Sequence, residues 1–388
     1  MKKRILQILS YVLAVALSCT LTLVISGNWQ RIAPESKLTQ LVALLDAYYV
    51  DEFDLEDLED AAARAMIEAL PDRWSYYISA DDYKAYEENK NNAYVGIGVT
   101  IQQNTEALTI LKVAAGGPAE EAGLLVGDVI VAADGTQIAG LPMADVKGLI
   151  QGKEGTSVEI TVLRGEQTLT YTVQRRTVRT PVATATMLEG NVGLVTIANF
   201  NSNCATESIA AVEQLLEQGA TMLVFDVRNN GGGYTAELVE LLDYLLPEGP
   251  LFRTVNYAGK EHVDYSDKHH VDVPMAVMVN GGSYSAAEFF AAALAEYDAA
   301  ILVGEQTSGK GYYQVTYKLK DGSAIAISIG KYFTPHGKSL EGVGLTPEVY
   351  VELPSELASA LSAGTLNPVE DPQILAAISA LMGDHAER

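Results

Sequence analysis

The sequence is poor in cysteine and in positive charge. Only two cysteines, Cys19 and Cys204, occur in 388 residues, so a fold stapled by several disulfides is excluded and the domains must be held by hydrophobic cores. The net charge is −24, and no long run of lysine and arginine follows residue 4. A phosphate backbone is repelled by such a chain, which argues against nucleic acid as a partner.

Several catalytic signatures are also missing. No Gly-x-Ser-x-Gly elbow is present, and the glycine-rich segment NNGGG (229–233) lacks the Gly-Lys-Ser/Thr ending of a phosphate-binding loop. Candidates for a base or a metal site are His262, Asp264, His269, His270, Asp272 and His336. None lies in a catalytic motif and their spacing matches no zinc pattern, so we interpret the histidines as surface or turn residues and expect neither a metal nor a cofactor.

The N-terminus carries the longest uncharged apolar run. Met1-Lys2-Lys3-Arg4 precedes an apolar stretch from Ile5 to Ile25, which is long enough to span a bilayer. The basic start predicts a membrane anchor over 1–30, with the following residues on the extracytoplasmic side. The alternative is a cleaved signal peptide, although no clear small-x-small site follows. Cys19 is interpreted as a small residue of this segment rather than as a lipid-attachment site.

Residues 31–91 predict a helical region. Apolar residues recur at helical spacing over 38–70, with Leu41, Leu44 and Tyr48 on one stripe and Leu55, Leu58 and Ala62 on another. Two amphipathic helices are expected. The acidic segment DEFDLEDLED (51–60) lacks the glycine and terminal glutamate of a calcium loop, so it predicts a solvated turn and a first helical turn.

Residues 92–176 resemble a PDZ domain. Short strand patterns alternate with glycine turns, and the segments Gly-Pro-Ala (117–119), Ala-Gly-Leu (122–124) and Gly-Asp-Val-Ile (127–130) follow in order. The triplet Gly96-Ile97-Gly98, with Val99, is expected to present backbone N–H groups to a peptide's terminal carboxylate. An adjacent strand edge would add the peptide by β-augmentation.

From about residue 180 the chain alternates strand and helix patterns, which predicts an α/β core over 177–350 within a multidomain α/β protein. Strands are expected at 191–200, 222–228, 275–279 and 300–304, and helices near 206–218, 235–246 and 285–297. The segment 229–233 lies between a strand and a helix, where it can serve as a backbone cradle. Residues 351–388 form a tail with a short helical pattern at 371–382.

Ser285 and Lys310 form the most informative pair. A turn of small residues aims Ser285 at a helix start, where unpaired N–H groups face a developing oxyanion. A lysine serves as base only when it is uncharged, which burial favours. Gly309 and Gly311 let the backbone pack closely around Lys310, and Gln314 returns to the same face four residues later. Taken alone, Ser285 is more simply a helix cap and Lys310 a loop residue.

A wider similarity favours the catalytic interpretation. From about residue 35 to 385 the chain resembles the carboxyl-terminal processing peptidases of the tail-specific serine protease family. Members carry a Gly-Ser-Ala-Ser-Ala-Ser-Glu-like run, then Gly-Glu-x-Thr-x-Gly-Lys-Gly with glutamine four residues after the lysine. The runs NGGSYSAAE (280–288) and GEQTSGKGYYQ (304–314) match these motifs. The resemblance also covers the segment 331–349.

The resemblance implies roles for individual residues. Ser285 matches the nucleophile, Lys310 the general base and Gln314 the residue that orients it. The family run Asp-Leu-Arg-Asn-Asn-Pro-Gly-Gly implies that amides of Gly232 and Ala286 form the oxyanion hole. It also implies a crotonase/ClpP-like α/β core and an N-terminal helical element that can support a homodimer.

Four positions depart from the family pattern. Tyr284 replaces the usual alanine, Ala287 a serine, Ser308 a phenylalanine and Gly231 the proline of the glycine-rich run. None of them removes a catalytic group, but Gly231 loosens the loop that carries Gly232.

The sequence therefore predicts a membrane-anchored serine endopeptidase of the cell envelope, which cleaves exported proteins near their C-termini and binds those termini through its PDZ domain. The alternative function is a catalytically silent PDZ scaffold that tethers exported proteins.

Overall fold

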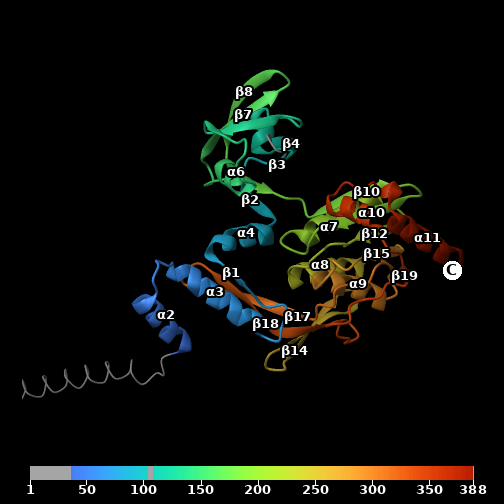
Figure 1. Ribbon diagram of the computed structural model, residues 1–388. Coiled ribbons are helices and arrows are strands. Elements are labelled where there is room, and N and C mark those ends of the chain that lie inside the picture. The colour runs from blue at the N-terminus through green and yellow to red at the C-terminus, as the bar shows by residue number, and fades with distance from the viewer. Residues whose placement is uncertain (1–35, 104–107, 388) are drawn as a thin grey trace, which may run out of the picture. The chain divides into compact units, whose positions relative to one another are not determined.

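The computed structural model describes residues 36–103 and 108–387, and its elements carry the labels of Figure 1. The predicted anchor over 1–30, including Cys19, lies outside the described residues. In the part of the chain that is described, no helix is both long and apolar enough to cross a membrane. The chain forms two compact units, Met1–Ala62 and Ala63–Arg388.

The first unit contains helix α2 (Lys37–Tyr48) and the start of helix α3 (Leu55–Glu68). The hydroxyl of Ser36 caps α2 by accepting a hydrogen bond from the Thr39 amide at 3.1 Å. The two predicted helices are thus confirmed, although no residue of α2 is buried. The acidic segment supplies the first turn of α3, as its pattern predicts.

The PDZ region has its own β-sheet and hydrophobic core. The sheet has the order β3-β4-β5-β7-β8, with β6 pairing β5, whereas β2 and β9 form a separate two-stranded sheet. Val158, Ile160 and Val162 alternate along β7 and are at most 1% exposed, because every second residue of a strand faces the core. The bounds are β2 Ala93–Gly96, β3 Val99–Gln103, β4 Leu108–Val113, α5 Pro118–Ala122, β5 Val129–Ala133, β6 Thr136–Gln137, α6 Met143–Ile150, β7 Ser157–Arg164, β8 Gln167–Gln174 and β9 Arg176–Arg179.

The α/β core is built on a six-stranded sheet with the order β10-β11-β12-β15-β16-β19. Only β10 is antiparallel to its neighbour. Every residue of β12 and β15 is buried, as parallel strands covered on both faces require. The bounds are β10 Ala183–Leu188, β11 Val192–Ile197, α7 Cys204–Glu217, β12 Met222–Asp226, α8 Thr235–Leu245, β15 Met275–Val279, α9 Ala286–Glu296, β16 Ala300–Gly304, β19 Val349–Tyr350, α10 Ser355–Ser362, η1 Pro368–Glu370 and α11 Pro372–Glu387.

The two faces of this sheet are covered by different helices (Figure 1). Helices α7, α8 and α9 share one hydrophobic core with residues of one face, such as Phe225 and Val277. Helix α11 packs on the other face through Ile374, Ala377 and Leu381. The helical pattern in the tail thus belongs to an element that completes the core.

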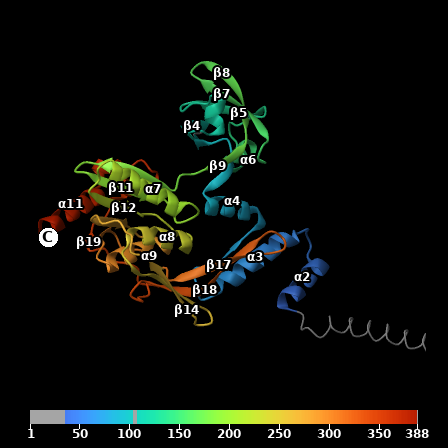
Figure 2. The same cartoon turned by 180° about the vertical axis from the view of Figure 1, so that it is seen from behind.

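A second, antiparallel sheet was not expected from the sequence, and helix α4 (Ala80–Asn91) lies within the predicted helical region 31–91 but was not placed individually. The sheet has the order β1-β18-β13-β14, and β17 also pairs β18, so that β17 and β18 lie side by side (Figure 2). Its strands are β1 Tyr76–Ile78, β13 Gly249–Asn256, β14 Glu261–Ser266, β17 Tyr312–Lys318 and β18 Ala324–Phe333. This sheet and α4 supply side chains to the candidate site.

Candidate active site

The segments that follow β12, β15 and β16 carry the predicted site residues. They are the glycine loop (229–233), the serine turn (280–285) and the lysine segment (305–311). Loops at the carboxyl ends of parallel strands meet at one edge of the sheet. Here the Tyr284 amide donates to the Asn230 carbonyl oxygen at 3.1 Å, and the Ser308 amide donates to the Ser283 carbonyl oxygen at 3.2 Å. Main-chain hydrogen bonds therefore join the serine turn to both neighbours.

Ser285 has a backbone conformation that residues with a side chain rarely adopt, with φ 58° and ψ −127°. Such strain costs about 1–3 kcal/mol and is typical of functional sites. The residue precedes helix α9, as predicted, and is 5% exposed. The Glu288 amide, which a capping hydroxyl would satisfy, donates to the Ser285 carbonyl oxygen at 2.8 Å. This bond and the capping box that Ser285 forms with Glu288 satisfy the helix start.

Glu288 connects the serine turn to the lysine segment. Its Oε2 accepts hydrogen bonds from the amides of Ser285 at 3.0 Å and Lys310 at 2.8 Å, and its Oε1 accepts from Gly309 N and Thr307 Oγ1. Burial raises the pKa of Glu288, and these hydrogen bonds oppose the rise. All four partners are donors, so the arrangement suits the ionised carboxylate.

The sequence motifs gave Glu288 no role of its own. A detectable signal was the glutamate three residues after a serine at a helix start, which is the spacing of a capping box.

The amine of Lys310 is withdrawn from water. Desolvation and the positive charge of Lys90 lower the pKa of Lys310 to about 8, against the opposing effects of Asp72, Glu341 and Glu288. A lysine with this pKa is partly neutral near physiological pH, which a general base requires. The predicted base thus has the expected electrostatic property.

Two aromatic rings hold the Lys310 side chain in this structure. Its Nζ lies 5.2 Å from the centroid of a Trp74 ring and 5.8 Å from that of Tyr284, and these two rings stack at 6.2 Å. Among the described residues, no hydrogen bond joins the amine to the Ser285 hydroxyl. The pairing of this amine with Ser285 stays a prediction.

Gln314 has other partners than the one predicted. It lies in β17, next to an irregularity in the pairing with β18. Its Nε2 donates to Ser328 Oγ at 2.9 Å and to the Tyr312 carbonyl oxygen at 3.3 Å. Its role in orienting Lys310 stays a prediction.

The predicted oxyanion residues are in close contact. A Cβ atom at Gly232, whose φ is 80°, would lie 2.8 Å from the Ala286 nitrogen, so only glycine fits there. The Gly232 amide donates to Oδ1 of Asn230 at 2.9 Å. This amide is therefore engaged within its own loop, and its role in an oxyanion hole stays a prediction.

Two of the departures from the family pattern depend on each other. A Cβ atom at Gly231 would lie 2.6 Å from the Tyr284 hydroxyl oxygen and 2.8 Å from its Cζ. The phenol thus occupies the space that a side chain at position 231 needs. Glycine at 231 accommodates tyrosine at 284, and the tyrosine in turn packs beside Lys310.

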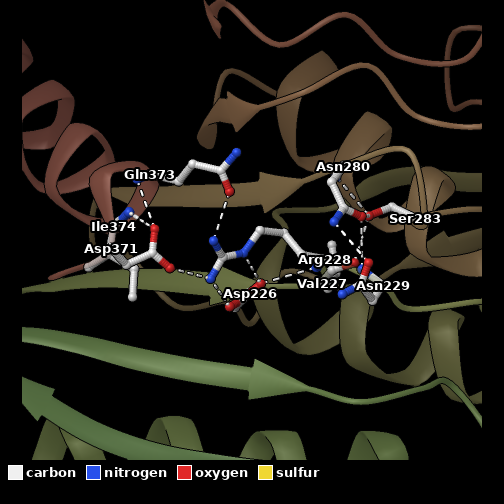
Figure 3. A network of polar contacts seen from close by, with 9 residues as sticks. All are labelled: Asp226, Val227, Arg228, Asn229, Asn280, Ser283, Asp371, Gln373 and Ile374. Atoms are coloured by element: carbon white, nitrogen blue, oxygen red, sulfur yellow. Dashed lines mark hydrogen bonds and ion pairs between the residues drawn. The ribbon is translucent and has the colours of Figure 1, made fainter. Parts of the chain in front are cut away.

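A buried ionic network stands behind the glycine loop (Figure 3). The Arg228 guanidinium donates to both carboxylate oxygens of Asp226, at 2.9 and 2.6 Å, and to Oε1 of Gln373 at 2.7 Å. Asp371 lies 2.8 Å from the same guanidinium. All four residues are at most 8% exposed. The network fastens the end of β12 to the start of α11.

A second group of contacts in Figure 3 joins the glycine loop to the serine turn. The Asn229 amide donates to Oδ1 of Asn280 at 2.9 Å, and Nδ2 of Asn280 donates back to Oδ1 of Asn229 at 2.9 Å. Ser283 Oγ donates to the Val227 carbonyl oxygen at 2.7 Å. Side chains from both loops thereby fix the backbone on either side of the site.

Ser285, Lys310 and Gln314 line one cavity of about 480 Å³, together with Gly231 and Gly233. The structure thus brings the three predicted catalytic residues together.

Other walls of this cavity come from elements that the sequence did not place. Tyr83, Tyr86, Glu87 and Lys90 belong to helix α4, and Tyr332 belongs to β18. Burial raises the pKa of Tyr332, and a hydrogen bond with Ser285 opposes the rise. The Tyr332 phenol thus lies next to Ser285.

The predicted peptide-binding residues line another cavity, of about 550 Å³. Gly96, Ile97, Gly98 and Val99 form one wall, and Ile150 of α6 contributes to another. β3 is an edge strand of its sheet, which is the geometry that β-augmentation requires. The peptide-binding role stays a prediction.

The rival chemistries find no assembled site. His262 pairs with Asp264 at 3.0 Å and His269 with Asp267 at 3.2 Å, and both histidines are exposed. Among the side chains that the structure describes, in residues 36–103 and 108–383, no group of three or more His, Cys, Asp or Glu is arranged to hold a metal ion.

Two family models match the chain. One is Peptidase family S41, over residues 191–351, and the other is a PDZ domain, over residues 109–164. The carboxy-terminal processing protease CtpA of Bacillus subtilis (strain 168) is 30% identical over 365 residues, which cover 91% of this chain and 78% of that protein. A CtpA-like serine protease of Staphylococcus epidermidis (strain ATCC 12228 / FDA PCI 1200) is 30% identical over 331 residues, covering 84% of this chain and 67% of that protein.

Solved structures resemble the chain as well. A crystal structure from Bacteroides fragilis NCTC 9343, assigned to the S41 proteases, has a TM-score of 0.51 and 20% identity, and covers 87% of this chain and 91% of that one. This similarity supports the fold. A photosystem II D1 C-terminal processing protease is 29% identical with a TM-score of 0.49, covering 86% of this chain and 92% of that one.

Proposed function

Because this chain belongs to the S41 family of serine-type peptidases and carries a PDZ domain, we propose that it cleaves exported proteins near their C-termini, with Ser285 as nucleophile and Lys310 as general base. The observation that carries the assignment is that a single buried carboxylate, Glu288, accepts hydrogen bonds from the amides of both residues at the wall of one cavity. The pKa of Lys310, about 8, supports its role as the base.

The chemistry follows from these groups. Neutral Lys310 takes the proton of Ser285 as its Oγ attacks the scissile carbonyl carbon, and the protonated amine then delivers that proton to the leaving nitrogen. In the second half of the reaction, neutral Lys310 takes a proton from water, which attacks the acyl carbon. The protonated amine then returns the proton to Ser285 Oγ as the acyl–oxygen bond breaks. Amides of Ala286 and Gly232 hold the oxyanion once Gly232 has left Asn230. Gln314 orients the amine.

The PDZ domain binds the substrate's free C-terminus in the proposed function. The supporting observation is a cavity at the edge strand β3, lined by Gly96, Ile97, Gly98 and Val99. Backbone N–H groups in this segment suit a terminal carboxylate.

Residues 1–30 anchor the enzyme in the membrane, on the extracytoplasmic side of the cell envelope, and the N-terminal helices support a homodimer. The basic start and the apolar run support the anchor. The exposed leucines of α2, such as Leu44 at 56%, support an association through that helix.

The test compares the purified full chain with Ser285→Ala on an unstructured protein that has a free C-terminus. Ser362→Ala, which alters an exposed serine of α10, is the matched control. We expect the wild type and the control to cleave and Ser285→Ala to be inactive. Equal cleavage by all three proteins contradicts the nucleophile, whereas peptide binding without any cleavage supports the scaffold.

A further inference from the structure

A second lysine lines the catalytic cavity. Lys90 lies near the end of α4, and its amine donates to Oδ1 of Asn201 at 3.3 Å. The rings of Tyr86 and Tyr234 lie 5.8 and 5.3 Å from this amine. Among the described residues, neither Lys90 nor Lys310 forms an ion pair. In a chain with 50 acidic and 26 basic residues, two unpaired ammonium groups in one cavity require an explanation.

The carboxylates around Lys310 are held by other donors. Asp72 accepts from two residues of its own turn, Glu341 from an indole and a backbone amide, and Glu288 from the four donors described above. The other titratable or charged groups on the walls of the cavity, or against the aromatic rings beside Lys310, are Tyr76, Tyr83, Tyr86, Glu87, Tyr234, Tyr284, Tyr332 and Arg73. None of these groups neutralises either lysine by an ion pair.

Helix α4 fixes Lys90 at this place. Tyr83, Tyr86, Glu87 and Lys90 recur at helical spacing on the face that lines the cavity. The Tyr86 hydroxyl pairs with Thr316 Oγ1 at 2.8 Å on β17. The contact of α4 with β17 therefore holds the backbone of Lys90 at the wall of the cavity.

Two like charges that share a partly buried cavity favour the loss of one proton. Burial lowers the pKa of both lysines, and the charge of Lys90 lowers the pKa of Lys310 further. Lys90 has a hydrogen-bond acceptor in Asn201, whereas within the described part of the chain the amine of Lys310 forms no hydrogen bond and contacts two aromatic rings. Lys310 is thus the group that releases its proton.

We propose that Lys90 is a positioning residue of the catalytic site, whose positive charge keeps the Lys310 amine in the neutral form that accepts the proton of Ser285. The proposal rests on the proposed function of the Ser285–Lys310 pair. It adds a residue from outside the serine and lysine motifs to the control of the base.

The experiment is the pH profile of kcat/KM for Lys90→Gln, Lys90→Arg and Lys84→Gln. Lys84 lies on the same helix with its side chain 65% exposed, so its substitution is the matched control. We expect Lys90→Gln to move the midpoint up by about half a unit, with about threefold lower kcat/KM at pH 7 and an unchanged plateau at high pH. Lys90→Arg and Lys84→Gln should keep the wild-type midpoint.

A second variant, Asn201→Asp, offsets the positive charge of Lys90 without removing the lysine. Asn201→Asp places a carboxylate beside Lys90 and should also move the midpoint up. A Lys90→Gln profile that superimposes on the wild type overturns the proposal, as does a lower plateau with an unmoved midpoint.

A readout without turnover separates this proposal from the proposed function. In Ser285→Ala, competitive acetylation of amines with acetic anhydride, followed by peptide mass spectrometry, gives the midpoint of Lys310 directly. An upward shift caused by Lys90→Gln in this background supports the role of Lys90 even if the enzyme assay fails. An unshifted midpoint refutes it even if the enzyme cleaves.

Discussion

The PDZ cavity and the catalytic cavity are similar in size but differ in what lines them. The former, about 550 Å³, is lined by residues 96–101 and by a mixture of apolar and polar residues, such as Ile150, Lys147 and Asn199. The latter, about 480 Å³, is lined by tyrosines, two lysines, a glutamine and a serine. Recognition by backbone tolerates many substitutions and changes of pH, whereas chemistry by side chains depends on the charge of each group. The two cavities should therefore respond differently to the same perturbation.

Glycine serves different purposes in the two regions. Gly98 has φ 80°, so its backbone conformation is the reason for glycine there. Gly231 has no such conformation, but the Tyr284 hydroxyl occupies the position of its missing side chain. A glycine required by its neighbour can be exchanged together with that neighbour.

Lys310→Met is expected to give the largest difference between the responses of the two cavities. Removal of the base should lower kcat about 10²–10⁴-fold, while the affinity of the PDZ domain for a C-terminal peptide stays at the wild-type value. Cleavage assays and fluorescence anisotropy measure the two effects. Loss of both properties would indicate misfolding, and full retention of cleavage would contradict the assignment of the base.

Glu288→Gln should give the next largest effect. The substitution keeps the side-chain volume but places an NH₂ group among four donors, which displaces the serine turn from the lysine segment. We expect kcat to fall by roughly 10²-fold with little change in KM or peptide affinity. Glu237→Gln, which alters a carboxylate that accepts from the amides of Asn203 and Ala205, is the control and should remain active. An equal loss of kcat in both variants would contradict the role of Glu288 in positioning the serine turn and the lysine segment.

A change of pH should alter cleavage at the Ser285–Lys310 cavity but not peptide binding at the PDZ cavity. The base acts when deprotonated and the pKa of Lys310 is about 8, so kcat/KM should rise about tenfold from pH 7 to pH 9 as the neutral fraction grows. Peptide affinity should stay constant over this range. A flat activity profile would show that Lys310 is already neutral at pH 7 or is not the base.

The smallest effect is expected from alanine at Gly231, which contacts Tyr284, and at Gly148, which has no close neighbour. Gly231→Ala should destabilise the protein by about 1–3 kcal/mol, because the new methyl group overlaps the Tyr284 phenol. In a Tyr284→Ala background the same substitution should be nearly neutral. Gly148→Ala on α6, where an added Cβ meets nothing within 4 Å, should stabilise slightly. Urea unfolding of the wild type, the three single variants and the double variant measures these effects, and additive effects at 231 and 284 would contradict the coupling.

Much of the fold could be predicted from sequence because it is encoded locally. Strands expected at 275–279 and 300–304 are β15 and β16 to the residue, since apolar runs between turns mark buried parallel strands. Helix α4 has no such signal, because its stabilising contacts reach residues far away in the chain, such as Thr316. The second sheet could not be predicted for the same reason, because β1 pairs with β18 across about 250 residues of sequence.

The site was only partly predictable. Motifs identified Ser285, Lys310 and Gln314, which the fold then collects in one cavity. Lys90 and Trp74 carry no motif, and only the folded chain places them beside Lys310. Likewise, spacing identified Gly231 and Tyr284 as separate departures, whereas their contact is visible only in three dimensions.

The Arg228 network has a consequence for the order of events during synthesis. Asp371 and Gln373, which receive the guanidinium behind the glycine loop, follow every predicted catalytic residue in the sequence. A nascent chain that already contains Ser285 and Lys310 therefore still holds a buried cation without its full set of partners, which is costly to sustain. We therefore expect the loops that carry Ser285 and Lys310 to reach their final arrangement only after residues 371–373 have been synthesised and have paired with Arg228.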